Sequence, residues 1–470
     1  MNDLHDFAKL SEKEKDDLIL ALLMQVKTLT AEVADLKGRL ALTSRNSSKP
    51  PTSDGLSKPA PKPKSLRIAG QNPTGGQKGH TGHTLKKVEK PDYIESHPAP
   101  SHCDACRAPL VGGTVIETRQ VFDLPTLRHE VTEHQVLQTQ CSCGKVHRGV
   151  FPEDVTAPAQ YGPRAMAAAV LMTNHHMGPV ARTGELMGDL FDLPMSNGTI
   201  LKASKTAQTL LTPTVELIAN ALQVAPVVGA DETGMRVATK LHWMHVLVTA
   251  TLTWMACHTK RGKEAFDDMG ILPLFMGTLI HDGWKPYREL LCKHGLCNAH
   301  HLRELTYQFE ELQQAWAKRM IELLVGACHE VGKVGGPLSQ ERMVYYRLVY
   351  EEILVEGETA NQKAPPIPGK RGKTPQSKGF NLLGRLRDYK DDVWRFATDP
   401  GVPFTNNLAE QAVRMSKVKQ KIAGCFRTKN GIDTYCTIRS YLATMRKQKA
   451  NIYQSLVLTF QGKTPQPKLA

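Results

Sequence analysis

Three acidic residues stand where a folded chain can use them to hold divalent metal ions. Asp231 and Asp282 each follow a short apolar run, which is typical of a buried strand that presents a carboxylate at its end. Glu410 lies in the first turns of an expected helix that Thr405 or Asn406 can cap. Mg²⁺ prefers oxygen ligands, and two such ions about 4 Å apart stabilise the attacking and leaving oxygens of a phosphodiester. The acids therefore favour phosphodiester chemistry, although an aspartate after a strand is more often a turn residue or a cap.

The charge distribution points to a polyanionic partner. The 470-residue chain has a formal net charge of +14. Ten Lys or Arg lie between Arg45 and Lys90 against two acids, and ten lie between Arg414 and Lys449 against one. Such clusters are typical of a surface that binds nucleic acid, although a merely solvated surface would have the same composition. The residues that we expect to contact DNA in these segments are Lys78, His80, Arg427 and Lys429.

The sequence has no feature of a secreted or membrane protein. No apolar run approaches the roughly 18 residues of a membrane span, and the N-terminal residues are polar and acidic, unlike a signal peptide. We therefore expect a cytoplasmic protein whose ten cysteines are reduced thiols unless they bind metal.

Two cysteine pairs have spacings that suit metal ligands. Cys103 and Cys106 form a Cys-x2-Cys pair, and Cys141 and Cys143 form a tighter Cys-x-Cys pair after a strand-like stretch. Four thiolates complete a tetrahedral site for one structural Zn²⁺, here in a small β-rich module. Buried free cysteines are the alternative interpretation, and the substitute ligands are His102 and His147.

The N-terminal segment has the pattern of a dimerising helix. Apolar residues recur at spacings of three and four, as in a heptad repeat, at Ile19, Leu22, Val26, Leu29, Val33, Leu36 and Leu40. β-branched residues at most a positions and leucine at d favour a parallel two-stranded coiled coil, and a helix packed on its own protein is the alternative. The segment that follows is rich in Pro, Ser, Lys and Gly, a composition typical of a flexible basic arm that tracks DNA.

The rest of the sequence predicts a multidomain α+β protein. Residues 156–224 have helical patterns that fit either a helix-turn-helix or an ordinary helical subdomain. Three strands, a helix and a fourth strand then follow one another, which is the order of a ribonuclease-H-like α/β core. An α-helical insertion separates the fifth strand from the helix of Glu410. The expected domains are residues 1–43 (coiled-coil helix), 44–95 (basic arm), 96–155 (zinc module), 156–224 (helical DNA-binding or linker region), 225–301 with 400–425 (catalytic core), 302–399 (insertion) and 426–470 (basic tail).

Six short motifs, in this order, resemble those of a known family. They are NSSKPPTSD at 46–54, GGQKGH at 75–80, DET at 231–233, HDGW at 281–284, CNAHHLRE at 297–304 and NNLAEQAVR at 406–414. Together with the heptad helix and the cysteine module, these motifs cover nearly the whole chain. The sequence resembles the DDE transposases of the insertion-sequence-66 family.

The resemblance implies a ribonuclease-H-like core in which Asp231, Asp282 and Glu410 bind two Mg²⁺ or Mn²⁺ ions. It also implies that Cys297 and His300 form an accessory Cys-x2-His pair, which binds metal, orders the helix, contacts DNA or only packs in the core. The implied partners are the terminal inverted repeats of the element, target DNA, a second copy of the chain, and accessory proteins encoded by the same element. Such an enzyme is bacterial and associates with the nucleoid when it binds DNA.

The implied activity is DNA strand cleavage at the element ends, followed by attack of the freed 3′-hydroxyl on target DNA. Arg414 and Lys417 follow Glu410 on the same helical face, where they either contact phosphates or, for Arg414, only pair with Glu410. Two other functions stay open. One is a catalytically silent, dimeric, zinc-containing DNA-binding regulator, and the other is a ribonuclease-H-like nuclease without strand transfer.

Overall fold

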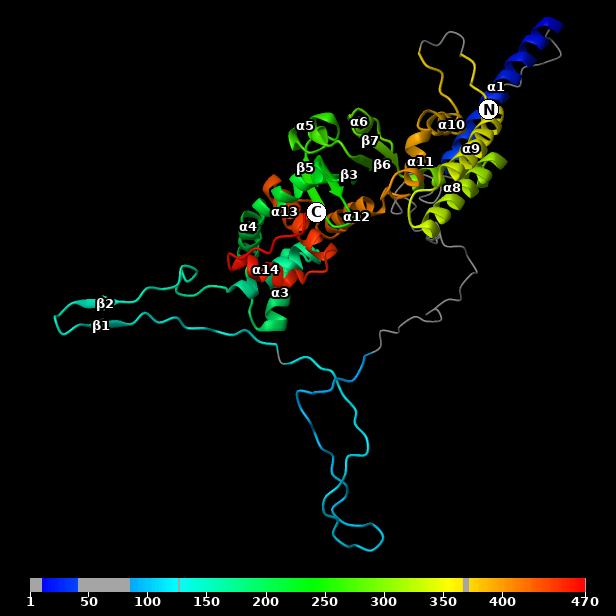
Figure 1. The fold of residues 1–470 in the computed structure, drawn as a ribbon. Helices are drawn as coiled ribbons and strands as arrows, with labels where there is room; N and C mark the ends of the chain where they lie inside the picture. Colours follow the sequence, from blue (N-terminus) through cyan, green and yellow to red (C-terminus); the bar gives the residue numbers. More distant parts are fainter. Residues whose placement is uncertain (1–10, 41–84, 126, 367–371, 470) are drawn as a thin grey trace.

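The computed structural model describes residues 11–40, 85–125, 127–366 and 372–469. A mixed sheet lies at the centre of the chain, with a group of helices at each end of it (Figure 1). Most of the predicted basic arm, including Lys78 and His80, lies outside the described residues.

The central sheet has five strands in the order β5-β4-β3-β6-β7. They are β3 (Val227–Val237), β4 (Lys240–Val248), β5 (Thr253–His258), β6 (Thr278–His281) and β7 (Lys293–Leu296). β3, β4 and β5 pair antiparallel, whereas β6 and β7 run parallel to β3. Ala238 and Thr239 join β3 to β4 with φ angles of 47° and 68°, the geometry of a two-residue hairpin turn. The predicted succession of three strands, a helix (α5, Lys263–Met269) and a fourth strand is confirmed.

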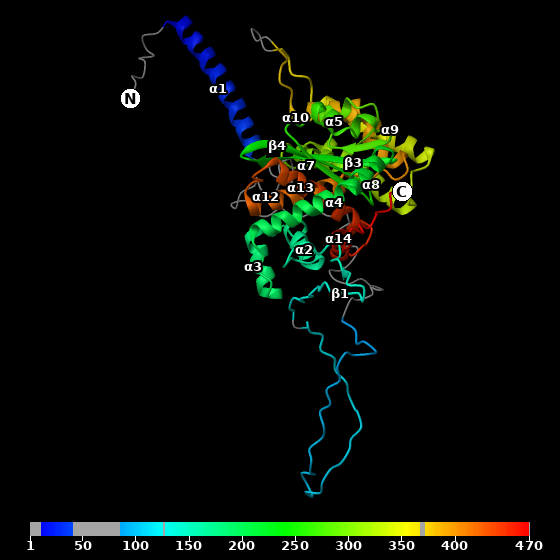
Figure 2. The same ribbon diagram turned by 90° about the vertical axis from the view of Figure 1, so that its left-hand side faces the viewer.

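Helices cover both faces of the sheet (Figure 2). Besides α5 they are α4 (Asn197–Gln223), α6 (Lys285–Arg288), α12 (Asn407–Ala423) and α13 (Lys429–Lys447). Met235 packs with residues of α12 and α13, whereas Val228 packs with residues of α4, α5 and α6. Because successive strand residues point to opposite faces, Asp231 faces α12, and Glu232 faces α5 and α6.

A helical subdomain combines segments from both halves of the chain. With α4 and α13 it contains α2 (Pro163–Val170), the π-helical turn η3 (Leu171–His175), α3 (Val180–Phe191) and α14 (Ile452–Phe460). Ser196 caps α4, because its Oγ accepts the N–H of Thr199 at 3.2 Å. α2, α4, α13 and α14 share one hydrophobic core.

Residues 426–470 are therefore not the basic tail that the sequence predicted. The apolar residues of α13 recur at helical spacing and are buried against α4 and β5, so this segment belongs to the core. Arg439, one of the basic residues counted in that segment, is itself buried, and its Nη1 lies 3.0 Å from Nδ1 of His175.

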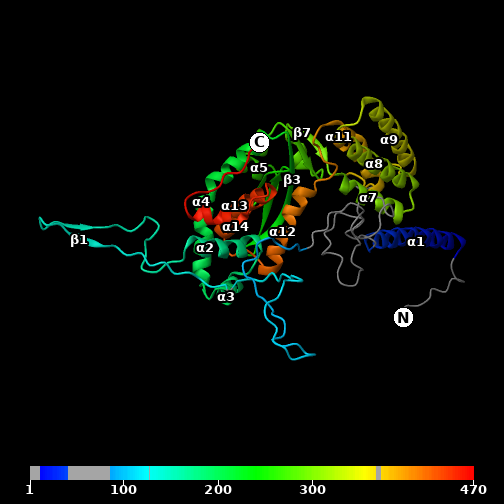
Figure 3. The same cartoon turned by 60° about the horizontal axis from the view of Figure 1, so that its bottom comes forward.

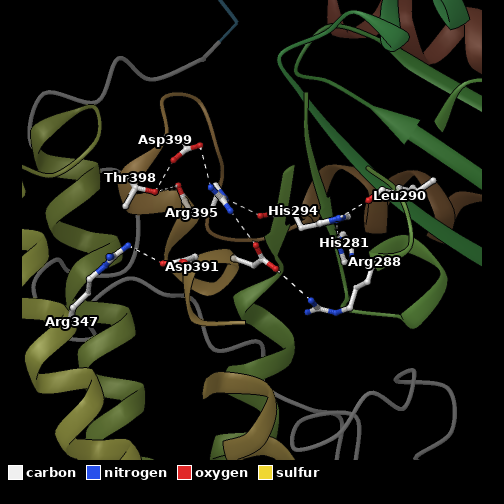
Figure 4. Close-up of polar contacts among 10 residues, drawn as sticks. His281, Arg288, Leu290, His294, Arg347, Asp391, Arg395, Thr398 and Asp399 are labelled. Atoms are coloured by element: carbon white, nitrogen blue, oxygen red, sulfur yellow. Dashed lines mark hydrogen bonds and ion pairs between the residues drawn. The ribbon is translucent and has the colours of Figure 1, made fainter. Parts of the chain in front are cut away.

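The insertion between β7 and α12 is helical, as predicted. Its helices are α7 (Asn298–Glu310), α8 (Ala315–Val334), α9 (Gln340–Ala360), α10 (Lys378–Asp388) and α11 (Lys390–Thr398). Trp316, Tyr350 and Trp394 are buried in its own core. Arg395 of α11 donates from Nε to the carbonyl of His294 on β7 at 2.9 Å, which fixes the insertion to the edge of the sheet (Figure 4). The insertion thus lies at the opposite end of the sheet from α2 and α3 (Figures 1 and 3).

α1 (Glu12–Leu40) is one continuous helix that begins with a capping box. Ser11 Oγ accepts the N–H of Glu14 at 3.4 Å, and Glu14 Oε2 accepts the N–H of Ser11 at 2.9 Å. The seven apolar residues of the predicted heptad repeat are between 47% and 73% exposed. None of the helices in the described part of the chain is long and apolar enough to cross a bilayer.

Residues 85–125 and 127–155 project from the rest of the protein (Figures 1 and 3). The short strands β1 (Gln138–Gln140) and β2 (Val146–Arg148) form an antiparallel hairpin there. Within the described ranges, the first buried residue of the chain is Ala167. The predicted zinc module therefore has no hydrophobic core of its own here, and a metal ion is the usual substitute for a core in a module of this size.

Candidate active site

Asp231 on β3 and Asp282 after β6 lie level with each other on neighbouring strands. β3 pairs with β6 only as far as Gly229, which is opposite Ile280. Continuing this parallel register by two residues sets Asp231 level with Asp282, which directly follows β6. Asp282 ends a strand as predicted, and its Oδ1 accepts the N–H of Trp284 at 2.8 Å.

The position of Asp231 within its strand differs from the prediction. The sequence predicted that β3 ends at this acid, but β3 continues to Val237 because the residues after Asp231 pair with β4 in the hairpin. The apolar run marks only the part of β3 that lies beside β6, so its end does not mark the end of the strand.

Asn406 positions the helix that carries Glu410, but in a different way from the predicted cap. It occupies the N-cap position of α12, yet its side chain accepts no helical N–H. Its Nδ2 instead donates to the carbonyl of Ala230 at 2.7 Å, next to Asp231. A Cβ at Gly229 would lie 2.5 Å from Asn406 Oδ1, so only glycine permits this close approach of helix and strand. Asn406 thus ties the start of α12 directly to β3.

The carboxylates influence one another electrostatically. Burial and, after it, the neighbouring charges of Glu232, Asp282 and Glu410 together raise the pKa of Asp231 to about 8, against one backbone hydrogen bond that lowers it. Glu410 behaves in the opposite way, since His300 and then Arg303 and Cys297 hold its pKa at about 2 despite partial burial. A divalent cation relieves repulsion of the kind seen at Asp231, so the donor set suits a hard metal ion.

Four side chains surround the carboxylate of Glu410. Cys297 Sγ donates to Oε1 at 3.5 Å, and His300 Nε2 lies 3.6 Å from the same oxygen. Arg303 Nη2 and Arg414 Nη2 lie 3.6 Å and 3.9 Å from Oε2. The predicted accessory pair is therefore brought against Glu410, and the ion pair between Arg414 and Glu410, which the sequence left as an alternative, is present.

Lys417 turns toward the sheet, where its Nζ donates to the carbonyl of Gly234 on β3. Arg427 and Lys429, which were predicted to bind DNA, are exposed. Arg427 lies just before α13, and Lys429 is the first residue of α13 and pairs with Asp433. These two cations remain at the surface, unlike the buried Arg439 of the same helix.

Sequence reasoning missed the part played by Glu232, the middle residue of the DET motif. Its buried carboxylate accepts from Arg261 Nε at 2.9 Å and Nη2 at 2.6 Å, and from the hydroxyl of Tyr287. The guanidinium of Arg261 lies between the rings of Trp243 and Trp284, 4.7 Å and 4.0 Å from their centroids. Arg261 is partly exposed whereas Glu232 is buried, so loss of Arg261 would leave a buried carboxylate without its charged partner. The only sequence signal was a second acid, directly after Asp231, on the opposite face of the strand.

Two histidines fix the loop after β6. His281 Nδ1 accepts the N–H of Gly283 at 3.0 Å, so its Nε2 carries the proton and donates to His294 Nδ1 at 3.1 Å. His294 Nε2 in turn donates to the carbonyl of Leu290 at 3.2 Å (Figure 4). Burial lowers the pKa of both rings, which keeps them neutral. This chain of hydrogen bonds, the His281–His294 relay, therefore stays intact. The residue after His281 is Asp282, so this relay holds the second aspartate in place.

The four predicted zinc ligands lie in two separate turns. Cys103 and Cys106 share the turn closed by the isolated bridge between His102 and Pro109, and Cys141 and Cys143 lie between β1 and β2. Among the residues that the structure describes, the group of three candidate metal ligands within 4.8 Å of one another is Cys297, His300 and Glu410. The structure thus keeps each cysteine pair together without joining the two pairs.

Two protein-family models match this sequence. The family model described as the IS66 family of transposases matches residues 158–434, more than half of the chain and all of the sheet. A second model, of a family of unknown function (DUF6444), matches residues 6–86. The search of curated proteins gave no match. The first match confirms the resemblance carried by the sequence motifs, and the chain belongs to the IS66 family of transposases.

Proposed function

We propose that this chain binds the terminal inverted repeats of an insertion element and catalyses metal-dependent DNA cleavage and strand transfer. The observation that carries the proposal is the convergence of three carboxylates from distant segments. Asp231 on β3 is level with Asp282, which follows β6, and Glu410 lies on the helix that Asn406 ties to β3. The charges of Asp282 and Glu410 both raise the pKa of Asp231, which means that the three acids lie within electrostatic reach.

The order of the strands supports the same mechanism. The sheet order β5-β4-β3-β6-β7, with the first three strands antiparallel and the last two parallel to β3, is that of a ribonuclease-H-like core. In such a core the first acid stands on the first strand, the second follows the fourth strand, and a late helix supplies the third. Asp231, Asp282 and Glu410 occupy these three places.

The three carboxylates would hold two Mg²⁺ or Mn²⁺ ions. When bound, such ions activate a hydroxyl nucleophile and stabilise charge on the attacking and leaving oxygens of the phosphodiester. The protein positions the acids through Asn406, through the pair of Glu232 with Arg261, and through the His281–His294 relay. Cleavage and strand transfer need no covalent enzyme intermediate, so positioning and electrostatic stabilisation carry the catalysis.

The test is an assay with labelled DNA that carries the terminal repeats of the flanking element. With Mg²⁺ and target DNA, the full-length chain should yield nicked repeat ends and then joined products, and EDTA should remove both. Binding without cleavage, even with the accessory proteins of the element added, would favour the silent regulator. Cleavage that never yields joined products would favour the plain nuclease.

The second part of this proposal is a homodimer. The exposed apolar residues of the heptad repeat in α1, which form the seam of a coiled coil, support it. Replacing Val26 and Leu29 by Lys should convert the dimer to a monomer, because each charge would lie in the apolar interface of the coiled coil. Leu20→Lys is the matched control, since Leu20 is also exposed on α1 but lies outside the seam. Light scattering coupled to size exclusion gives the mass. An unchanged mass in the double variant would contradict a dimer made by α1.

The predicted structural zinc stays a prediction. Each pair lies in a tight turn, where the backbone N–H groups of Cys106 and Cys143 are the main cause of a lowered pKa at Cys103 and Cys141, respectively. Lowered thiol pKa values favour the thiolate form that binds metal. One Zn²⁺ joining both turns would supply the cross-link that the described residues of this module lack.

A further inference from the structure

The group formed by Cys297, His300 and Glu410 has the donor atoms of a transition-metal site. Cys297 Sγ lies 3.5 Å from Glu410 Oε1, and His300 Nε2 lies 3.6 Å from the same oxygen. All three donor atoms lie within 4.8 Å of one another. The hydrogen bonds among these side chains explain part of this proximity, so the distances have to be compared with those of a coordination sphere.

The distances match the edges of a zinc tetrahedron. With Zn–S bonds of about 2.3 Å and Zn–N and Zn–O bonds of about 2.0–2.1 Å, tetrahedral angles place neighbouring ligand atoms about 3.3–3.5 Å apart. The distance from Cys297 Sγ to Oε1, 3.5 Å, falls at the upper end of this range, and that from His300 Nε2, 3.6 Å, lies just above it. Three protein ligands leave a fourth vertex open, as in catalytic and regulatory zinc sites. We propose that Cys297, His300 and Glu410 bind one Zn²⁺-like transition-metal ion.

The local fold supplies these ligands from two rigid elements. Cys297 is the N-cap residue of α7 and His300 lies within its first turn, so the Cys-x2-His spacing places both side chains at one helix end. Glu410 comes from the first turn of α12. The backbone N–H of Asn406 donates to Cys297 Sγ at 3.2 Å, the kind of contact that stabilises a metal-bound thiolate. No rearrangement of the backbone is needed to bring the three ligands together.

Ligand chemistry separates this site from one for Mg²⁺. Thiolate and imidazole ligands favour zinc and similar ions, whereas Mg²⁺ selects oxygen. Arg303 and Arg414 oppose a cation here, but both contact Oε2 of Glu410 and leave Oε1 to the metal. A thiolate and a carboxylate together balance the two charges of the ion.

Occupation of this site has a consequence for catalysis, and that consequence alone rests on the proposed function. Glu410 would serve two sites, so an ion held by Cys297 and His300 would draw Oε1 away from the site shared with Asp231 and Asp282. Zn²⁺ would then act as an inhibitor that locks the third acid of the triad. Binding of the transition-metal ion needs neither DNA nor catalytic activity. The metal site and the proposed function can therefore be rejected independently of each other.

The test uses Co²⁺ as a spectroscopic probe of thiolate coordination in the full-length chain. Cys103, Cys106, Cys141 and Cys143 are replaced by Ser to remove the predicted structural site. This background should develop the thiolate-to-cobalt absorption band of one Co²⁺, and Zn²⁺ should abolish that band. Cys297→Ser should abolish the band, whereas Cys292→Ser should keep it, because Cys292 is a buried cysteine outside the ligand group.

Two outcomes would overturn the proposal. They are the absence of a thiolate band in the background protein, and a band that persists after Cys297→Ser. Circular dichroism establishes whether each variant is folded. If Cys297→Ser is not folded, His300→Ala decides, with an expected loss of at least about tenfold in cobalt affinity. An affinity unchanged by His300→Ala would equally reject the site.

Discussion

Asp282→Asn is expected to lower strand cleavage and strand transfer by at least about 10³-fold while DNA binding stays within about twofold. Asp282 is exposed, and its Oδ1 accepts the N–H of Trp284 at 2.8 Å. Asparagine keeps that acceptor oxygen and the shape of the side chain, so the substitution removes only the negative charge. The measurements are Mg²⁺-dependent product formation on labelled terminal-repeat DNA and the dissociation constant of the same DNA.

A matched control distinguishes loss of the negative charge at the candidate site from loss of a negative charge elsewhere on the protein. Asp267 is exposed on α5, and Asp267→Asn makes the same chemical change away from the three acids. This control should retain the activity of the wild type. If Asp282→Asn retained more than about one tenth of strand transfer, the carboxylate would not be a metal ligand, and the assignment of the triad would be wrong. Equal losses in both variants would show a global effect of charge on DNA binding.

The sheet was predictable because its signals are local. Apolar runs of strand length, the Gly and Pro breaks between them and the acid after β6 all lie within short windows of sequence. The parallel pairing of β3 with β6 then places Asp231 and Asp282 level with each other without further information. Glu410 was found in the same way, from the cap-like residues before an amphipathic helix.

The rest of the site depends on contacts between distant parts of the chain. In the sequence, Glu232 is only the residue after Asp231. Its role depends on contacts with Arg261 and Tyr287, which are distant from it in the sequence. The sequence predicts that the side chain of Asn406 caps α12. It cannot show that the same side chain donates to the carbonyl of Ala230 instead. Such competition is settled by tertiary packing and not by local preference.

Positive charge in the sequence was the least reliable signal for residues that contact DNA. Lys419 and Arg439 both counted toward the basic C-terminal segment, yet both are buried. Lys419 Nζ donates to the carbonyl of Thr173 at 3.0 Å and to that of Gly178 at 3.3 Å. These two side chains join the C-terminal helices to η3 and the loop after it, so they contribute to the fold and not to a DNA-binding surface. Arg427 and Lys429, which are exposed, remain candidates for DNA contact.

Asp231→Asn should stabilise the metal-free protein at alkaline pH. Burial, with the charges of Glu232, Asp282 and Glu410, raises the pKa of Asp231 from 3.8 to about 8. The folded chain therefore holds this proton more tightly than the unfolded chain. Below about pH 4 both states are protonated, and as the pH rises toward 8 the unfolded state gains by losing its proton first, so stability falls. Above about pH 8 that loss is complete.

Asparagine removes this penalty and keeps the hydrogen bond, since Asp231 Oδ1 accepts the N–H of Glu232 at 2.9 Å. In EDTA, the free energy of unfolding of Asp231→Asn should exceed that of the wild type by up to about 5 kcal/mol at pH 8 and by close to zero at pH 4. Urea unfolding of both proteins at each pH measures the difference. Subtracting the wild-type value cancels the other titrating groups, so a difference that does not change with pH would contradict the raised pKa. Mg²⁺ should stabilise the wild type at pH 8 far more than the variant, because the charge that destabilises the empty site is the charge that binds the ion.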